Sequence, residues 1–489
     1  MNFSLAKKAT CLLFVMLLTI PLLFACGERT DNGDSTKQTT SPSSETKDPN
    51  APDLPDLTFD GAVVRFITRG SGDSTYSELW NTVDIYADTI NADVINNAVY
   101  WRNEYIQDKY DIVIQHNPVA NVANVAKNAI QSDSDEFDVI VMPLRYTPSF
   151  ISDQQLIDLY EVDHLDLSKP YWDQNLTKET SIANKIYYAT GDISISDNDA
   201  TWILMFNKDM IEDFNLESPY DLVHENKWVN DKMYEMMQAV NADLNQDNNM
   251  TIDDRFGLAT TPDTQFALYY SSGERIIKKD NDDLPYLTVN TERIHTVFEN
   301  ASKIVSDPNL TAITARMGVY PAVIQSIFEK GNALFYGEVM QCVARIRNME
   351  IPFGIIPWPK LSEDQDRYYN YLNYAASVNC IPVTNKDLET TGFLLEAMAA
   401  KSVDTLTVAY YDKTLTQRDI RDEESKEMLD IILDSLVYDL GYIYNWGSLS
   451  SMISSIMVSG ENTFASKYAT VERVVKKMMD ADIKKILEN

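Results

Sequence analysis

Basic residues are scarce in this chain of 489 residues. Lysine and arginine total 41 against 74 aspartates and glutamates, which gives a formal net charge of −33 at pH 7. A chain with this charge repels nucleic acid and anionic lipid head groups, so we expect no nucleic-acid partner.

Histidine is also rare, and the signatures of several enzyme classes are missing. The four histidines, His116, His164, His224 and His295, lack the spacing of metal ligands. The sequence contains no phosphate-binding GxxxxGK(S/T) loop, no HExxH and no GxSxG. We therefore do not expect an enzyme. A glycosidase stays open as an alternative, because it needs two carboxylates and 74 acids identify no particular pair.

The few cysteines divide between the amino terminus and the body. Lys7 and Lys8 precede an apolar run to Ala25, which predicts an export signal over residues 1–25. The following Leu-Phe-Ala-Cys-Gly resembles a bacterial lipobox, which implies an acylated Cys26 at the outer face of the cell membrane. The alternative is a signal peptide that merely contains a cysteine. In the body, Cys342 and Cys380 could form a disulfide, but we favour two small buried thiols.

Apolar residues are almost absent from 26–57, a stretch of Ser, Thr, Asp, Lys, Gly and Pro. Such a stretch cannot bury enough surface to offset its conformational entropy. We expect a disordered tether that holds a folded body away from the membrane.

Strand and helix patterns alternate in the body, which is long enough for two domains. Strand patterns at 62–68, 111–116 and 137–144 enclose helix patterns at 91–110 and 121–130, and further strand patterns occupy 332–339 and 353–359. This order predicts an α/β fold with a parallel sheet whose ligands gather at the carboxyl ends of the strands. Residues 471–487 predict an amphipathic helix with one apolar stripe: Val471, Val474, Val475, Met478, Ile483 and Ile486.

Oxygen-bearing side chains alternate along residues 243–254, in the spacing of a twelve-residue calcium loop. Position six of such a loop needs a left-handed residue, and Asn248 tolerates that conformation. We expect a weak structural Ca²⁺ site, and the alternative is a solvated turn that closes the preceding helix. The predicted ligands are Asp243, Asn245, Asp247, Asn249, Thr251 and Asp254.

Aromatic residues are plentiful, with 27 tyrosines and 7 tryptophans. Their flat faces can stack on sugar rings while carboxylates and amides bind the hydroxyls, although most of them belong to the core. We assign Trp228 to the core.

Four stretches of the body resemble a known family. They are YATGDISISDNDATWILMFNKDMIEDFNLESPYDLV, KWVNDKMYEMMQAVNADLNQDNNMTIDDRFGLA, FGIIPWPKLSEDQDRYYNYLN and AYYDKTLTQRDIRDEESKEMLDII, in this order. Together with the lipobox that precedes them, these stretches resemble those of the extracellular solute-binding lipoproteins of bacterial carbohydrate ABC importers. The resemblance implies a two-lobe type II periplasmic-binding-protein fold with a ligand cleft between the lobes, a carbohydrate ligand, importer permease subunits as partners, and no catalysis.

The resemblance also implies how the chain is divided. Lobe 1 would take residues 58–190, lobe 2 residues 191–372, and residues 373–489 would return to lobe 1 and end in helices. Segments near 188–200 and 368–380 would cross between the lobes. Strand ends and crossings supply the expected ligand-binding residues: Arg69, Tyr76, Arg145, Tyr146, Asp192, Asp197, Asn198, Asp199, Tyr371, Tyr374 and Trp446. As a set they suit a neutral polyol, because acids outnumber bases among them.

Two other functions fit the same sequence. A secreted glycan-acting enzyme would share the export signal, the aromatics and the calcium loop, but it would convert its substrate. A ligand-free surface protein would show no stabilisation by any small molecule.

Overall fold

The computed structural model describes residues 48, 50–72, 80–415, 423–461 and 463–488. The predicted signal peptide, Cys26, most of the predicted tether and Tyr76 lie outside the described residues. No helix in the described part of the chain is both long enough and apolar enough to span a membrane.

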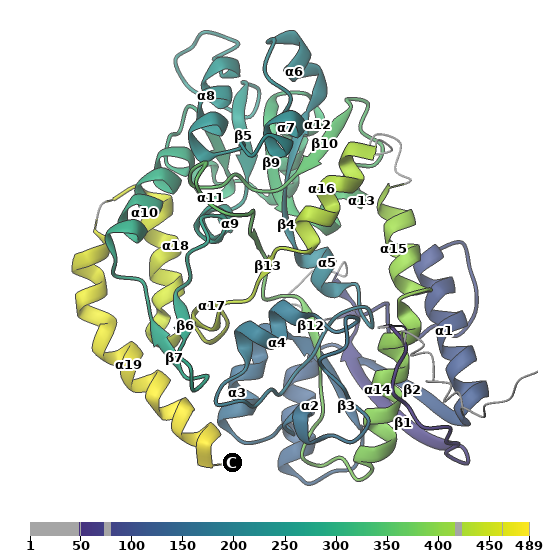
Figure 1. Ribbon diagram of the computed structural model, residues 1–489. Coiled ribbons are helices and arrows are strands. Elements are labelled where there is room, and N and C mark those ends of the chain that lie inside the picture. Colours follow the sequence, from purple (N-terminus) through teal and green to yellow (C-terminus); the bar gives the residue numbers. More distant parts are fainter. Residues whose placement is uncertain (1–47, 49, 73–79, 416–422, 462, 489) are drawn as a thin grey trace, which may run out of the picture. The chain divides into compact units, whose positions relative to one another are not determined.

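The first lobe is built on a four-stranded sheet in the order β12-β3-β1-β2. Strands β2, β1 and β3 are parallel, as the alternation of strand and helix predicts, and β12 runs antiparallel beside β3. Helices α1, α2 and α14 pack on this sheet (Figure 1). The strands are β1 (Ala62–Arg69), β2 (Ile112–Val119), β3 (Val139–Pro143) and β12 (Ser377–Cys380). The helices are α1 (Val94–Tyr110), α2 (Val122–Gln131), α3 (Thr147–Ser152), α4 (Gln174–Thr180), α14 (Leu388–Ser402) and α15 (Leu406–Leu415).

The second lobe is built on a five-stranded sheet in the order β10-β4-β9-β5-β8. Strand β4 is antiparallel to both of its neighbours, whereas β9, β5 and β8 are parallel. Its strands are β4 (Trp202–Asn207), β5 (Phe256–Thr260), β8 (Thr311–Ile313), β9 (Ala333–Val339) and β10 (Phe353–Ile356), and a separate hairpin pairs β6 (Ile277–Lys279) with β7 (Pro285–Leu287). Its helices are α6 (Lys208–Asp213), α7 (Pro219–His224), α8 (Asn230–Val240), α9 (Thr264–Ser271), α10 (Glu292–Val305), α11 (Thr314–Met317), α12 (Pro321–Glu329) and α13 (Val343–Ile346).

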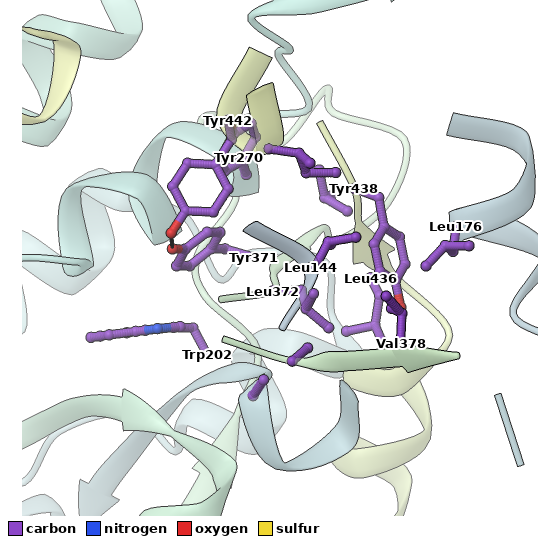
Figure 2. Close-up of a cluster of buried hydrophobic side chains, with 14 of the residues drawn as sticks. Leu144, Leu176, Trp202, Tyr270, Tyr371, Leu372, Val378, Leu436, Tyr438 and Tyr442 are labelled. Carbon is purple, nitrogen blue, oxygen red and sulfur yellow. Dashed lines mark hydrogen bonds between the residues drawn. The ribbon is translucent and has the colours of Figure 1, made fainter. Parts of the chain in front are cut away.

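Among the described residues, two chain segments connect the two sheets, and a third, later segment packs beside them. The first contains α5 (Ser196–Ala200), and the second and third contribute β11 (Asn370–Tyr371) and β13 (Leu436–Val437), which pair in parallel. Large apolar side chains from these segments and from both sheets pack together at the crossing (Figure 2). Within this cluster the hydroxyls of Tyr371 and Tyr442 are hydrogen-bonded, and the Tyr371 ring lies 6.1 Å from that of Trp202. The crossing segments, which form the hinge between the lobes, are therefore held by a packed apolar core.

The carboxyl-terminal helices contact both lobes. Helix α16 (Glu423–Leu433) packs on β10, and α18 (Leu449–Ser459) packs on α9 and α10, so part of residues 373–489 lies against the second lobe. Helix α17 (Leu440–Tyr444) precedes α18, and the last helix, α19 (Phe464–Glu488), contacts α3 of the first lobe.

The folded body begins before residue 58, which corrects the predicted end of the tether. Lys169 donates from Nζ to the carbonyl of Ala51 at 3.0 Å and pairs with Asp53 at 2.9 Å. Leu54 and Leu57 pack against the core. These two leucines provide the apolar contact that the polar composition of the stretch obscures.

The two cysteines of the described residues are free and buried, which confirms the interpretation as thiols. Trp228 is fully buried, and its indole N–H donates to the carbonyl of Pro357 at 2.9 Å, which confirms its place in the core.

Candidate functional site between the lobes

The carboxyl ends of strands from both sheets converge on the second crossing segment. After β3 of the first lobe, the backbone N–H of Arg145 donates to the carbonyl of Tyr374 at 3.2 Å. After β5 of the second lobe, Asp263 accepts a hydrogen bond from the side-chain amide of Asn373 at 2.8 Å. Because Asn373 and Tyr374 are adjacent, a polar residue from each lobe lies beside the same crossing.

Two acids at the carboxyl ends of second-lobe strands have pKa values near neutrality. Burial raises the pKa of Asp263 to about 6. Burial also raises the pKa of Glu338, near the carboxyl end of β9, to about 7, and the charge of Asp263 acts in the same direction. A carboxyl that keeps its proton near neutral pH can donate a hydrogen bond as well as accept one. Such groups suit hydroxyl ligands.

A cavity of about 630 Å³ opens between the lobes. This volume lies within the range of about 300–1,000 Å³ that is usual for small-molecule sites. Its walls come from the segment before α1 and the start of α1, from the first crossing, from the residues after β9, and from α15. The lining residues are Thr82, Val83, Tyr86, Asn91, Asp93, Ile95, Asn96, Ile195, Asp199, Met340, Gln341, Val343, Ala344, Arg345, Arg347, Tyr410, Lys413 and Thr414.

Asp199 lies in the wall that the first crossing contributes. Its carboxylate accepts a hydrogen bond from the Tyr410 hydroxyl at 3.1 Å, which ties the crossing to α15. Burial raises the pKa of Asp199 to about 7. Asparagine and glutamine amides, the half-buried carboxyl of Asp199 and two tyrosines therefore line one space. Together they can bind a polyhydroxylated ligand through hydrogen bonds and ring contacts.

The other acids of the first crossing line a different space. Asp192, Asp197 and Asn198 border a second cavity of about 400 Å³, together with Trp172 and Tyr411. Asp192 accepts from the hydroxyl of Thr407 at 2.6 Å, and Asp197 accepts from that of Thr190 at 3.1 Å. Of the four polar residues predicted at this crossing, the structure thus places Asp199 in the larger cavity and the other three outside it.

The remaining predicted ligand residues fall into two groups. Arg69, Arg145, Tyr146 and Tyr374 lie at the strand ends and the second crossing; Arg69 is buried and the other three are half-buried. Tyr371 and Trp446 instead lie in packed clusters and are 1% and 2% exposed. Trp446 stacks on Tyr444 at 4.4 Å and donates from its indole N–H to Asp482 of α19 at 2.7 Å. A packing role accounts for these contacts of Tyr371 and Trp446.

Several residues of the larger cavity were not predicted. Gln341, Arg345 and Arg347 follow β9, so the strand-end rule that selected Arg69 and Arg145 would also have selected them. Asn96 is near the start of α1 and Tyr410 is on α15, and no local pattern marks either of them. Their proximity depends on the contact between α1 and α15.

The predicted calcium loop satisfies its own carboxylates by hydrogen bonds. Asp243 accepts from the backbone N–H groups of Gln246 and Asn248 at 2.8 and 2.7 Å. Asp254 accepts from those of Leu244 and Thr251, also at 2.8 and 2.7 Å. Asn248 has φ +62°, the left-handed conformation that position six requires. Among the described residues, however, no three acidic, histidine or cysteine side chains are grouped so as to hold a metal ion. A cation would have to draw these carboxylates together.

No family model matches the sequence, and no curated protein matches it. Solved structures do match the fold. One is the sugar-binding protein MalE from the phytopathogen Xanthomonas citri, with a TM-score of 0.56 and 11% identity over 87% of this chain and 98% of that one. Another is a cyclo/maltodextrin-binding protein complexed with maltotetraose, with a TM-score of 0.54 and 12% identity over 88% and 97%. A third is the ABC substrate-binding protein Lmo0181 from Listeria monocytogenes in complex with cycloalternan, with a TM-score of 0.51 and 11% identity over 87% and 99%. The chain has the two-lobe, type II periplasmic-binding-protein fold.

Proposed function

We propose that this protein is an extracytoplasmic solute-binding lipoprotein that captures a carbohydrate, most simply an oligosaccharide, and delivers it to the permease subunits of an ABC importer. The observation that carries the proposal is the cavity of about 630 Å³ between two α/β lobes, lined by amides, the half-buried carboxyl of Asp199 and tyrosines. The neighbouring folds support it, because those solved structures are of a sugar-binding protein, a cyclo/maltodextrin-binding protein and an ABC substrate-binding protein.

The mechanism follows from the hinge. A ligand that contacts both walls of the cavity favours the conformation in which the walls are close, and a permease can then distinguish loaded from empty protein. The protein itself performs no catalysis in this proposal. Its carboxyls bind hydroxyls and transfer no proton to a glycosidic bond.

Anchoring completes the proposal. The lipobox-like Cys26 would carry a diacylglycerol, and two acyl chains suffice for stable attachment to a membrane. Mass spectrometry of the mature amino terminus tests this: we expect an acylated Cys26, and an unmodified chain that begins at another residue would refute the anchor. We further propose that the loop 243–254 binds Ca²⁺ weakly, because Asn248 already has the required conformation.

The test of the function is a thermal-shift screen of the mature protein against mono- and oligosaccharides, followed by chromatography of each bound sugar. We expect at least one oligosaccharide to raise the melting temperature and to be recovered intact. Hydrolysed products would favour an enzyme. A panel without any stabilising sugar would leave the protein without the proposed ligand.

A further inference from the structure

Two arginines lie on the second-lobe wall of the larger cavity. Arg345 belongs to the short helix α13, and Arg347 directly follows that helix. Both line the cavity, and both are exposed, so a ligand can reach them. Among the described residues, neither guanidinium forms a salt bridge with a carboxylate. Arg345 also interacts with the Cys342 thiol and with the charge of Glu338, whose pKa burial raises to about 7. Because neither contact is a salt bridge, both guanidiniums can still bind an incoming anion.

The other charges of the cavity do not cancel these two. Lys413, on the opposite wall, pairs with Asp93 at 3.0 Å. Asp199 is half-buried, accepts a hydrogen bond from Tyr410, and has a pKa raised by desolvation to about 7. Below that pH the lining is positive, although the whole chain has a net charge of −33. A positive recess in so acidic a protein indicates a ligand with a negative charge.

The arrangement also specifies the kind of anion. A guanidinium matches a carboxylate with two parallel N–H···O bonds, and such charge-assisted bonds are about twice as strong as neutral ones. Asn91, Asn96 and Gln341 lie in the same lining and can bind hydroxyls, and Tyr86 offers a ring face. A carboxylate and several hydroxyls on one molecule describe a uronic acid.

We propose that the preferred ligand is an acidic oligosaccharide whose uronate carboxylate binds Arg345 and Arg347. This proposal rests on the proposed function, since it assigns a substrate class to the same cavity. It also revises the neutral polyol expected from the sequence. That expectation counted the acids near the crossings, and three of those polar residues border the other cavity.

The test compares matched sugars by calorimetric titration of the mature protein. The pairs are xylotriose with and without a glucuronic acid branch, and trigalacturonate against galactotriose. We expect the acidic member of at least one pair to bind about tenfold more tightly than the neutral one, as one or two charge-assisted bonds predict. We also expect its affinity to fall between about 0.05 and 0.5 M salt.

Substitutions of the two arginines test whether they cause the preference for the acidic sugar. Arg345→Gln and Arg347→Gln should each weaken binding of the acidic sugar about tenfold and leave binding of the neutral sugar unchanged. Arg473→Gln, at an exposed arginine of α19, is the matched control and should change neither. Circular dichroism and melting curves of all three variants verify that they fold.

Each contrary outcome is distinct. Equal affinity for the neutral and acidic members, or full affinity of both arginine variants for the acidic sugar, would overturn the uronate proposal and leave carbohydrate capture standing. Failure of all carbohydrates to bind the folded protein would overturn the proposed function together with the uronate proposal.

Discussion

The Tyr410 hydroxyl lies 3.1 Å from the carboxylate of Asp199 and donates a hydrogen bond to it. Tyr410 belongs to α15, which packs on α1 of the first lobe, whereas Asp199 belongs to the first crossing. One hydrogen bond thus joins two walls of the larger cavity, the first crossing and α15, at a carboxyl that burial keeps protonated up to a pH of about 7.

We expect this carboxyl to make stability depend on pH. The pKa of Asp199 is about 7 in the folded protein, and an unfolded aspartate has a pKa of about 3.9. The folded state therefore holds the proton more tightly. The resulting stabilisation is complete below a pH of about 4 and is lost as the pH rises through about 7.

Asp199→Asn removes this dependence, because an amide does not ionise. Relative to wild type, the variant should gain more melting temperature at a pH of about 8 than at about 5. The control is Glu350→Gln, at an exposed acid, which should show no such difference between the two pH values. Differential scanning fluorimetry checks both variants, and equal gains at the two pH values for Asp199→Asn would contradict the assignment.

Two buried tryptophans should both stabilise the fold. Trp228 is fully buried, and its indole N–H donates to the carbonyl of Pro357. Trp446 is 2% exposed, and its indole N–H donates to Asp482 of α19. Replacement of either by alanine should cost about 3–5 kcal/mol of unfolding free energy, measured in urea. Trp101→Ala, at a side chain 58% exposed, should change it by less than about 0.5 kcal/mol. If Trp446→Ala kept full stability and lost sugar binding, Trp446 would be a ligand contact.

Calcium should stabilise the protein modestly if it binds the loop 243–254. At ten times its dissociation constant, a ligand that binds the folded state alone adds about 1.4 kcal/mol. Millimolar calcium should therefore raise the melting temperature of wild type and of Asp253→Ala, but not of Asp247→Ala, which removes a predicted ligand. An identical response of the two variants would show that the loop is a polar turn.

Loss of one cavity amide should weaken binding without unfolding the protein. Gln341→Ala should lower the affinity for sugar about tenfold, because a hydroxyl of the bound sugar then lacks its hydrogen-bond partner. Gln325→Ala, on α12 and outside the cavity lining, is the matched control.

Small-angle scattering should also show a smaller radius of gyration when sugar is added to wild type. An unchanged radius with saturating sugar would contradict hinge closure.

Several elements of both lobes followed from local sequence, because strand and helix periodicity are local signals. The strand patterns at 62–68 and 332–339 correspond to β1 and β9, and the helix pattern at 91–110 corresponds to α1. The stripe expected in α19 was partly wrong. Val475 and Ile486 are buried as predicted, but Val474 is 51% and Met478 is 46% exposed, while Tyr468 and Met479 are buried. The face that α19 buries depends on its neighbours, among them α3 and the turn at Trp446, and its own sequence does not reveal them.

The candidate site was harder to predict than the fold. The carboxyl ends of the first-lobe strands predict Arg145, which lies beside the second crossing but outside the lining of the larger cavity. Arg345 lines that cavity and follows β9 of the second lobe, whose strand end the prediction did not include. Trp446 was chosen for its residue type and local sequence, and neither reveals that Asp482, 36 residues later, accepts its N–H. Residue type predicts what a side chain can do. Contacts between distant segments decide whether it faces a ligand.

The measurement that tests carbohydrate capture most directly is calorimetric titration of the mature protein with a panel of neutral and acidic oligosaccharides, with chromatography of the sugar afterwards. We predict saturable one-to-one binding of at least one sugar with a dissociation constant of about 1 μM or lower, roughly −8 kcal/mol, and recovery of that sugar unchanged. Absence of heat for every sugar, or recovery of cleaved products, would contradict the account.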